Sequence, residues 1–219
     1  TTSCLANYNL LEILTHIGHS EKVFNMKRLI LILILICSLQ SWTKADEVNE
    51  MSIEGLSVGD SALTFFTKED IDKNTFDYYK IKTFVPVQID KLDFFKTYDA
   101  VDFSYRKNDS KYIITGLNGI LFITDPIECE KKLDQIILEI SPVFNDAIEI
   151  EKAEIIHDSD PSGKSKIIEK QWVLTNGDRI LVQCYNFDAS FNSQNHLSVT
   201  LRTKEFHEFL RKIAYKDNA

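Results

Sequence analysis

The feature that most constrains the fold is a repeated alternation of apolar and polar side chains along short segments of the chain. Between residues 100 and 106, the apolar Val101, Phe103 and Tyr105 alternate with Asp102, Ser104 and Arg106. Because successive side chains of a β-strand point to opposite faces, this period of two predicts a strand with one face toward the core. We predict strands at residues 83–89, 100–106, 112–117, 120–124, 147–156, 166–175, 179–186 and 196–202.

Two longer helices follow the two groups of strands. Asp125-Pro126-Ile127-Glu128 supplies an N-cap residue, a proline at the first helical position and a glutamate at the third, and Pro142 ends the apolar pattern that follows. The last helix is predicted at residues 204–215, where apolar residues recur at helical spacing. A shorter helix is predicted to start after Thr67, with Asp70 at its third position.

This order of elements predicts an α+β fold. We expect an antiparallel sheet of about seven to eight strands in two meanders, each followed by a helix packed on one face. Asn118-Gly119 is a predicted hairpin turn, because both residue types tolerate the positive φ of a type I′ turn, and Asn176-Gly177 is a second turn. Pro86 lacks a backbone donor, so its strand is predicted at a sheet edge.

The N-terminal part of the chain contains a predicted secretory signal at residues 26–45. Met26 is followed by Lys27-Arg28, an apolar run over residues 29–37 and a polar stretch that ends at Ala45. The apolar run is shorter than the roughly 20 residues that span a bilayer, and the adjoining basic pair disfavours a buried helix or an anchor. We therefore divide the chain into an upstream extension (1–25), a signal peptide (26–45) and a single α+β domain (46–219). The domain is expected in the bacterial periplasm or secreted, without a stable membrane anchor once the signal is cleaved.

Cleavage at this point would leave two cysteines, Cys129 and Cys184. In an oxidising compartment an even pair predicts a disulfide bond. The alternative is two buried free thiols, because free cysteine is among the most buried residue types.

The overall composition indicates a globular protein with an acidic surface. Apolar residues make up 44% and charged residues 26% of the chain, and the formal net charge is −8. A phosphate backbone or an anionic membrane surface selects clustered lysine and arginine, so neither is an expected partner. The expected partner is instead another protein or a small ligand.

One group of residues has the spacing of a calcium-binding loop. Asp158, Asp160 and Ser162 alternate, Gly163 follows, and Glu169 is the twelfth residue. Pro161 departs from this pattern, and the flanking segments are predicted strands rather than helices. The alternatives are a calcium-stabilised module, with Ca²⁺ as its cofactor, and a polar turn that binds no ion.

Gly59-Asp60-Ser61 resembles the nucleophile block of the GDSL-type lipases and esterases. In that family a histidine three residues after an aspartate supplies the base, but Ser193 and Lys204 stand three residues before His196 and His207. Helix capping by Asp60 or Ser61 is the better interpretation, and the GDSL-like hydrolase is the weakest alternative. No catalytic residue is assigned from the sequence.

Residues 52–66, the segment 111–122 and Gly163-Lys164-Ser165 are similar to a group of small exported proteins from AT-rich marine bacteria. The resemblance implies an envelope location and adds no activity. The expected function is therefore that of a non-enzymatic exported envelope protein that binds a partner or a small ligand.

Overall fold

The computed structural model describes residues 47–191 and 193–216, all within a compact unit that spans Lys44–Ala219. The proposed extension (1–25) and signal peptide (26–45) lie outside the described residues. Among the described helices, none has the length and apolarity needed to cross a membrane.

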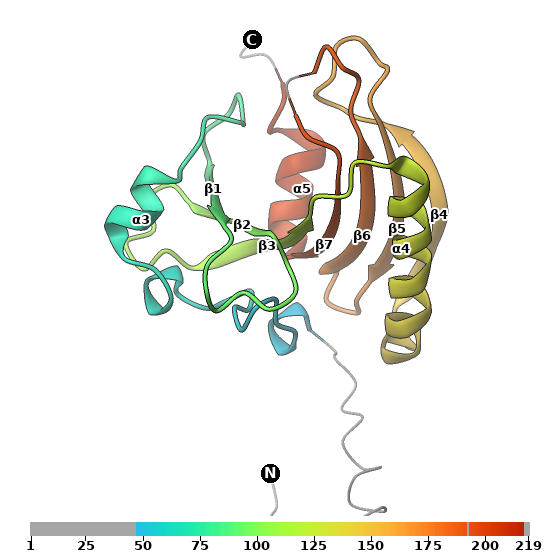
Figure 1. Cartoon of the computed structure of the whole chain (residues 1–219). Helices are drawn as coiled ribbons and strands as arrows, with labels where there is room; N and C mark the ends of the chain where they lie inside the picture. Colours follow the sequence, from blue (N-terminus) through green and yellow to red (C-terminus); the bar gives the residue numbers. More distant parts are fainter. Residues whose placement is uncertain (1–46, 192, 217–219) are drawn as a thin grey trace, which may run out of the picture. The chain divides into compact units, whose positions relative to one another are not determined.

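The described chain is built on one antiparallel sheet of seven strands, which confirms the predicted α+β class (Figure 1). The strands are β1 (Phe84–Asp90), β2 (Ala100–Arg106), β3 (Ile114–Leu121), β4 (Ile148–Ile156), β5 (Lys166–Val173), β6 (Arg179–Asn186) and β7 (His196–Arg202). Their order across the sheet is β1-β2-β3-β7-β6-β5-β4, so β3 and β7 meet at the centre. β1, which carries Pro86, is an edge strand as predicted.

In the described part of the chain, three α-helices accompany the sheet: α3 (Lys68–Lys73), α4 (Pro126–Ile140) and α5 (Lys204–Lys212). The side chain of Thr67 accepts a hydrogen bond from the backbone N–H of Asp70, and the Asp70 carboxylate accepts one from the backbone N–H of Thr67, which completes a capping box at the start of α3. Asp125 accepts a hydrogen bond from the backbone N–H of Ile127 at the start of α4, as its sequence predicted. Short 3-10 helices span Val48–Glu50, Ala62–Thr64 and Ser141–Phe144.

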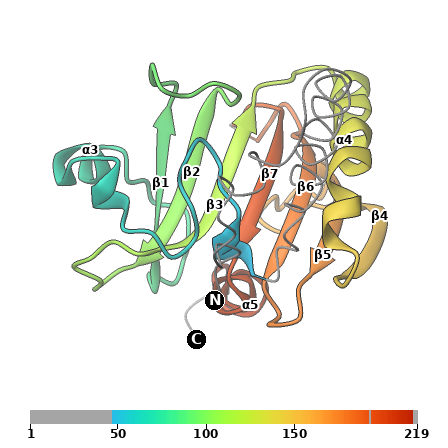
Figure 2. The same ribbon diagram turned by 90° about the horizontal axis from the view of Figure 1, so that it is seen from below.

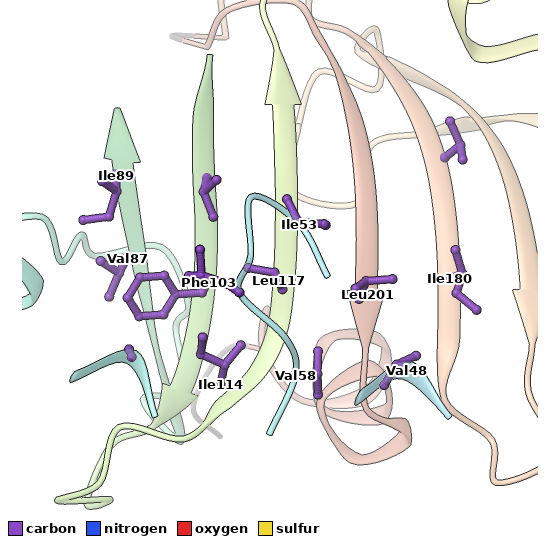
Figure 3. Close-up of a cluster of buried hydrophobic side chains, with 14 of the residues drawn as sticks. Val48, Ile53, Val58, Val87, Ile89, Phe103, Ile114, Leu117, Ile180 and Leu201 are labelled. Atoms are coloured by element: carbon purple, nitrogen blue, oxygen red, sulfur yellow. The ribbon is translucent and has the colours of Figure 1, made fainter. Parts of the chain in front are cut away.

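The main hydrophobic core lies on the sheet face that α4 covers. In Figure 3, Val48, Ile53 and Val58 of the N-terminal segment lie over Leu117 of β3 and Leu201 of β7. Cys129 and Leu133 of α4 belong to the same buried cluster. Burying such side chains contributes about 1.5–3 kcal/mol each, so this face holds most of the apolar stabilisation.

The opposite face of the sheet carries α5. Phe206 and Phe209 of this helix form a second buried cluster with Phe84 of β1 and Tyr79. The views from the front and from below show α4 and α5 on different sides of the sheet (Figures 1 and 2). The prediction that the helices pack on one side is therefore not confirmed, because α4 and α5 lie on opposite faces of the sheet.

The predicted turn at Asn118-Gly119 is wrong. Both residues lie inside β3, where Asn118 pairs with Asp102 of β2 and Thr200 of β7. A Cβ atom on Gly119 would lie 2.7 Å from the ring of Tyr98, so glycine serves here for close packing rather than for a turn. The turn at Asn176-Gly177 is confirmed: Gly177 has φ of +88° and its N–H donates to the carbonyl of Leu174.

A disulfide bond joins Cys129 of α4 to Cys184 of β6, as predicted, with the Cα atoms 5.9 Å apart. Both residues are buried. The bond attaches α4 to the sheet face that holds the main core.

Candidate functional site

The sheet face toward α5 is lined by polar side chains that neighbouring strands place side by side. Gln88 lies opposite Asp102, Asp102 opposite Asn118, and Asn118 opposite Thr200. Directly paired residues of an antiparallel sheet hold their Cβ atoms about 4.5–5.5 Å apart. The register therefore builds a continuous polar row from β1 to β7, across a face that a simple two-layer fold would fill with apolar residues.

A second polar group lies on β5 and β6. Gln183 donates a hydrogen bond of 2.9 Å from Nε2 to Oε2 of Glu169, and the Tyr185 hydroxyl donates one of 3.1 Å to Oε1 of Gln183. Gln171 donates to the other oxygen of Glu169, and Arg179 donates from Nη1 to Oε1 of Gln171 at 3.0 Å. The network fixes the orientation of these side chains.

A cavity of about 480 Å³ lies above this polar face. Its floor includes residues of β1, β2, β3, β5, β6 and β7, and α5 forms one wall with His207, Leu210 and Arg211. Two loops meet at its rim, where the hydroxyl groups of Tyr78 and Ser159 are 3.2 Å apart in a hydrogen bond. The cavity is thus bounded by the sheet, a helix and two loops.

Stacked rings form another wall of the cavity. The ring of His196 stacks on Tyr185 with centroids 4.5 Å apart, and Tyr185 stacks on Phe187 at 5.7 Å. His157 contacts the edges of both Tyr185 and Phe187. Burial lowers the pKa of His157 and His196, so both rings are neutral near pH 7 and present flat, weakly polar surfaces to the cavity.

Three buried polar atoms of the cavity lining have no hydrogen-bond partner among the described residues. They are Oδ1 of Asp102, Nε of Arg202 and Nδ1 of His207. The other such atom in the described chain is Nε1 of Trp172, which belongs to the core on the opposite face. A buried polar group without a partner costs about 1–3 kcal/mol, so each of these three atoms is an unfavourable feature of the cavity lining.

Asp102 is held in an unusual electrostatic state. Burial raises its pKa to about 7, and the nearby carboxylate of Asp90 contributes in the same direction. Near neutral pH the side chain is therefore present in both protonation states, so that it can either donate or accept a hydrogen bond in the cavity.

His207 is held neutral at the other end of the cavity. Burial lowers its pKa to about 3, with further contributions from Arg179, Arg202 and Arg211. The positive potential of these guanidinium groups disfavours an imidazolium ion, so the end of the cavity near α5 is cationic although its histidine is not.

The residues of the predicted calcium loop do not surround one point. The carboxylate of Asp160 accepts hydrogen bonds from the N–H and hydroxyl of Ser162 and from the N–H of Ser165. Glu169 lies in β5 and faces the cavity, while Asp158 lines the rim. In residues 47–191 and 193–216, no cluster of three histidine, cysteine or acidic residues could hold a metal ion. The carboxylate of Asp160 stabilises the turn over residues 160–165 through these hydrogen bonds, and calcium binding stays a prediction.

Ser61 is occupied by a backbone contact. Its hydroxyl donates a 2.6 Å hydrogen bond to the carbonyl of Lys111, and its backbone forms a bridge to Ile113. Ser61 is the N-cap residue of the 3-10 helix Ala62–Thr64, although its side chain makes no capping hydrogen bond. Its hydroxyl therefore anchors this helix to the segment before β3, and the three histidines described above line the cavity elsewhere.

The cavity was not predicted from the sequence. The strand alternation identified Asp102 and Ser104 as one face of β2, but no element was predicted to cover that face. A usable signal was that polar residues recur on the same face of four further strands, at Asn118, Glu169, Gln183 and Thr200.

Comparison with known proteins finds no matching family model, no similar curated protein and no similar solved structure.

Proposed function

We propose that this chain is an exported, non-enzymatic protein that binds a small organic ligand in the cavity between the polar sheet face and α5. One observation carries the proposal: the unpartnered atoms of Asp102, Arg202 and His207 all lie in the lining of this cavity. A ligand with hydrogen-bonding groups would satisfy them, and the free energy recovered would favour binding.

The size and lining of the cavity support a small molecule rather than a macromolecule. Ligand pockets commonly enclose about 300–1,000 Å³ and combine apolar walls with a few polar groups. The cavity, at about 480 Å³, falls in this range. Its rings of Tyr185 and His196 offer an apolar contact surface, and the polar row of β1, β2, β3 and β7 offers directional hydrogen bonds.

Export to an envelope or extracellular compartment is supported by two observations. The segment 26–45 has the composition of a secretory signal, and the described domain contains a disulfide bond. Disulfide bonds persist in oxidising compartments and are rare in the cytosol. The resemblance to small exported proteins of marine bacteria agrees with this placement.

The proposal is tested by a thermal-shift screen with a library of small polar organic compounds. A ligand at one hundred times its Kd stabilises the native state by about 2.7 kcal/mol. For a domain of this size such a gain raises Tm by roughly 5–10 °C. We expect at least one chemical class to produce such a concentration-dependent rise.

Two matched variants locate the site. Asn118→Phe places a ring in the floor of the cavity, whereas Asn145→Phe places the same ring at an exposed position after α4. We expect the first to abolish the ligand-induced shift and the second to retain it. Equal shifts in both variants, or a library without a single stabilising compound, would refute the proposed function.

A further inference from the structure

Two arginines lie directly opposite each other on neighbouring strands near α5, and one of them, Arg202, lines the cavity. Arg179 of β6 pairs with Arg202 of β7 in the sheet register, and both residues face α5. Like charges directly opposite on neighbouring strands destabilise a sheet. A negatively charged group near Arg179 and Arg202 would offset the repulsion between their two positive charges.

α5 adds a third guanidinium to this pair. His207 and Arg211 are four residues apart on the helix and both line the cavity. Arg211 lies close enough to Arg179 to lower its pKa, in addition to the larger effect of burial. The charges of Arg179, Arg202 and Arg211 therefore act on one small region.

No carboxylate within the described ranges forms an ion pair with these arginines. The acidic groups that act electrostatically on Arg179 are engaged elsewhere: Glu208 pairs with Lys212, and Glu169 accepts hydrogen bonds from glutamine side chains. In contrast, Arg106, the last residue of β2, forms an ion pair with Glu205 of α5. The arginines are thus not held in direct ion pairs, although the carboxylate of Glu169 lies in the same cavity and offsets part of their charge.

We propose that the ligand is an organic anion, and that its carboxylate or phosphate group binds between Arg202, Arg211 and His207. This inference rests on the proposed function and names the chemistry of the ligand. Arg202 lines the cavity, and its guanidinium suits carboxylate and phosphate because its planar fork matches their geometry. The body of the ligand then lies along the polar row, with an apolar part against the rings of Tyr185 and His196.

The experiment uses three probes that share one ring: benzoate, phenyl phosphate and the uncharged benzyl alcohol. Their affinities for the wild-type protein are measured by calorimetric or NMR titration. We expect at least one anion to bind more tightly than the alcohol, and the preferred anion identifies carboxylate or phosphate as the recognised group. The anion is also expected to shift the pKa of His207 upward, because it offsets the potential of the arginines.

Two single substitutions that remove one positive charge each provide the comparison. Arg202→Gln removes a subsite group, and we expect it to weaken anion binding by roughly tenfold or more while leaving the alcohol unaffected. Arg106→Gln removes an ion-paired arginine outside the cavity lining and should leave anion affinity unchanged. If Arg202→Gln does not fold by circular dichroism, Arg211→Gln replaces it, because Arg211 is exposed and its loss leaves the sheet intact.

Several outcomes would overturn the inference. Benzyl alcohol binding as tightly as both anions, failure of both anions to bind, or equal anion affinity in the wild type and in Arg202→Gln would each reject an anion subsite. The proposed function is judged separately. If one of these results is found, a neutral or cationic compound that shifts Tm in the wild type and not in Asn118→Phe would leave the cavity as a ligand site while the anion is excluded.

Discussion

Phe206 of α5 lies directly on Gly116 of β3: a Cβ atom at position 116 would be 2.3 Å from Cε1 of the ring. The same ring packs against Phe84 of β1, with centroids 5.1 Å apart. The absence of a side chain at Gly116 thus allows α5 to approach the sheet, and this approach forms one wall of the cavity.

Gly116→Ala should therefore displace α5 and destabilise the domain by about 1–3 kcal/mol, the usual cost of overpacking a core. Urea unfolding measures the change. In a Phe206→Leu background the same substitution should cost less, because the smaller side chain leaves room for the new methyl group. An equal cost in both backgrounds would show that Gly116 does not serve to admit the ring.

The stability of the domain should depend on the protonation of Asp102. Because the pKa of this carboxyl is raised to about 7, above the value of about 3.9 in an unfolded chain, the native state binds the proton more tightly. The contribution is fully present below pH 4 and is lost as the pH rises through 7. Asp102→Asn, which does not titrate, should remove this part of the decline between pH 5 and pH 8 in urea unfolding, whereas an unchanged slope would contradict the assignment.

Loss of the disulfide bond between Cys129 and Cys184 should weaken the attachment of α4 to the sheet. The two residues are 55 positions apart, and the chain-entropy account assigns a loop of this length about 4 kcal/mol. The double variant Cys129→Ala/Cys184→Ala should lose stability of this order. A reductant should destabilise the wild type and leave the double variant unchanged; peptide mapping that recovers both thiols free in the wild type would disprove the bond.

Asp160 should stabilise its turn whether or not calcium is present. Its carboxylate accepts hydrogen bonds from Ser162 and Ser165, and these hold its pKa below the usual range. Asp160→Ala is therefore expected to lower Tm in calcium-free buffer. Calorimetry of the wild type with Ca²⁺ and with a chelator tests the calcium prediction separately: an unchanged Tm would end it.

The secretory signal predicts a specific cleaved product. Expressed with its signal segment in a bacterium, the protein should be recovered from the periplasm or the medium with an N-terminus close to residue 46, as read by mass spectrometry. Recovery of the intact chain from the cytosol, with residues 26–45 retained, would reject export.

The sequence predicted the elements of the fold well where local chemistry decides them. The bounds of β2, β6 and β7 agree with the predicted strands, because polar and apolar residues alternate in β2 and β7 and turn residues precede β6. The starts of α3 and α4 agree because capping by Thr67 and Asp125 is a local interaction.

The prediction failed where tertiary contacts override local preference. Asn118-Gly119 has the composition of a turn, yet Tyr98 covers the glycine and the strand continues. The candidate site could not be predicted for a related reason. Whether the polar side of a strand faces water or a cavity depends on where α5 packs. The sequence of the strand alone does not determine the position of that helix.

The most direct test of the central claim is an NMR titration of the isotope-labelled domain with small organic fragments. We predict that the amide signals that move on binding belong to residues of the polar face, such as Asp102, Asn118 and Thr200, and to α5 around His207. If the only signals that move belong to α4, on the opposite face of the sheet, or if no fragment moves any signal of the polar face, the cavity is not a ligand site.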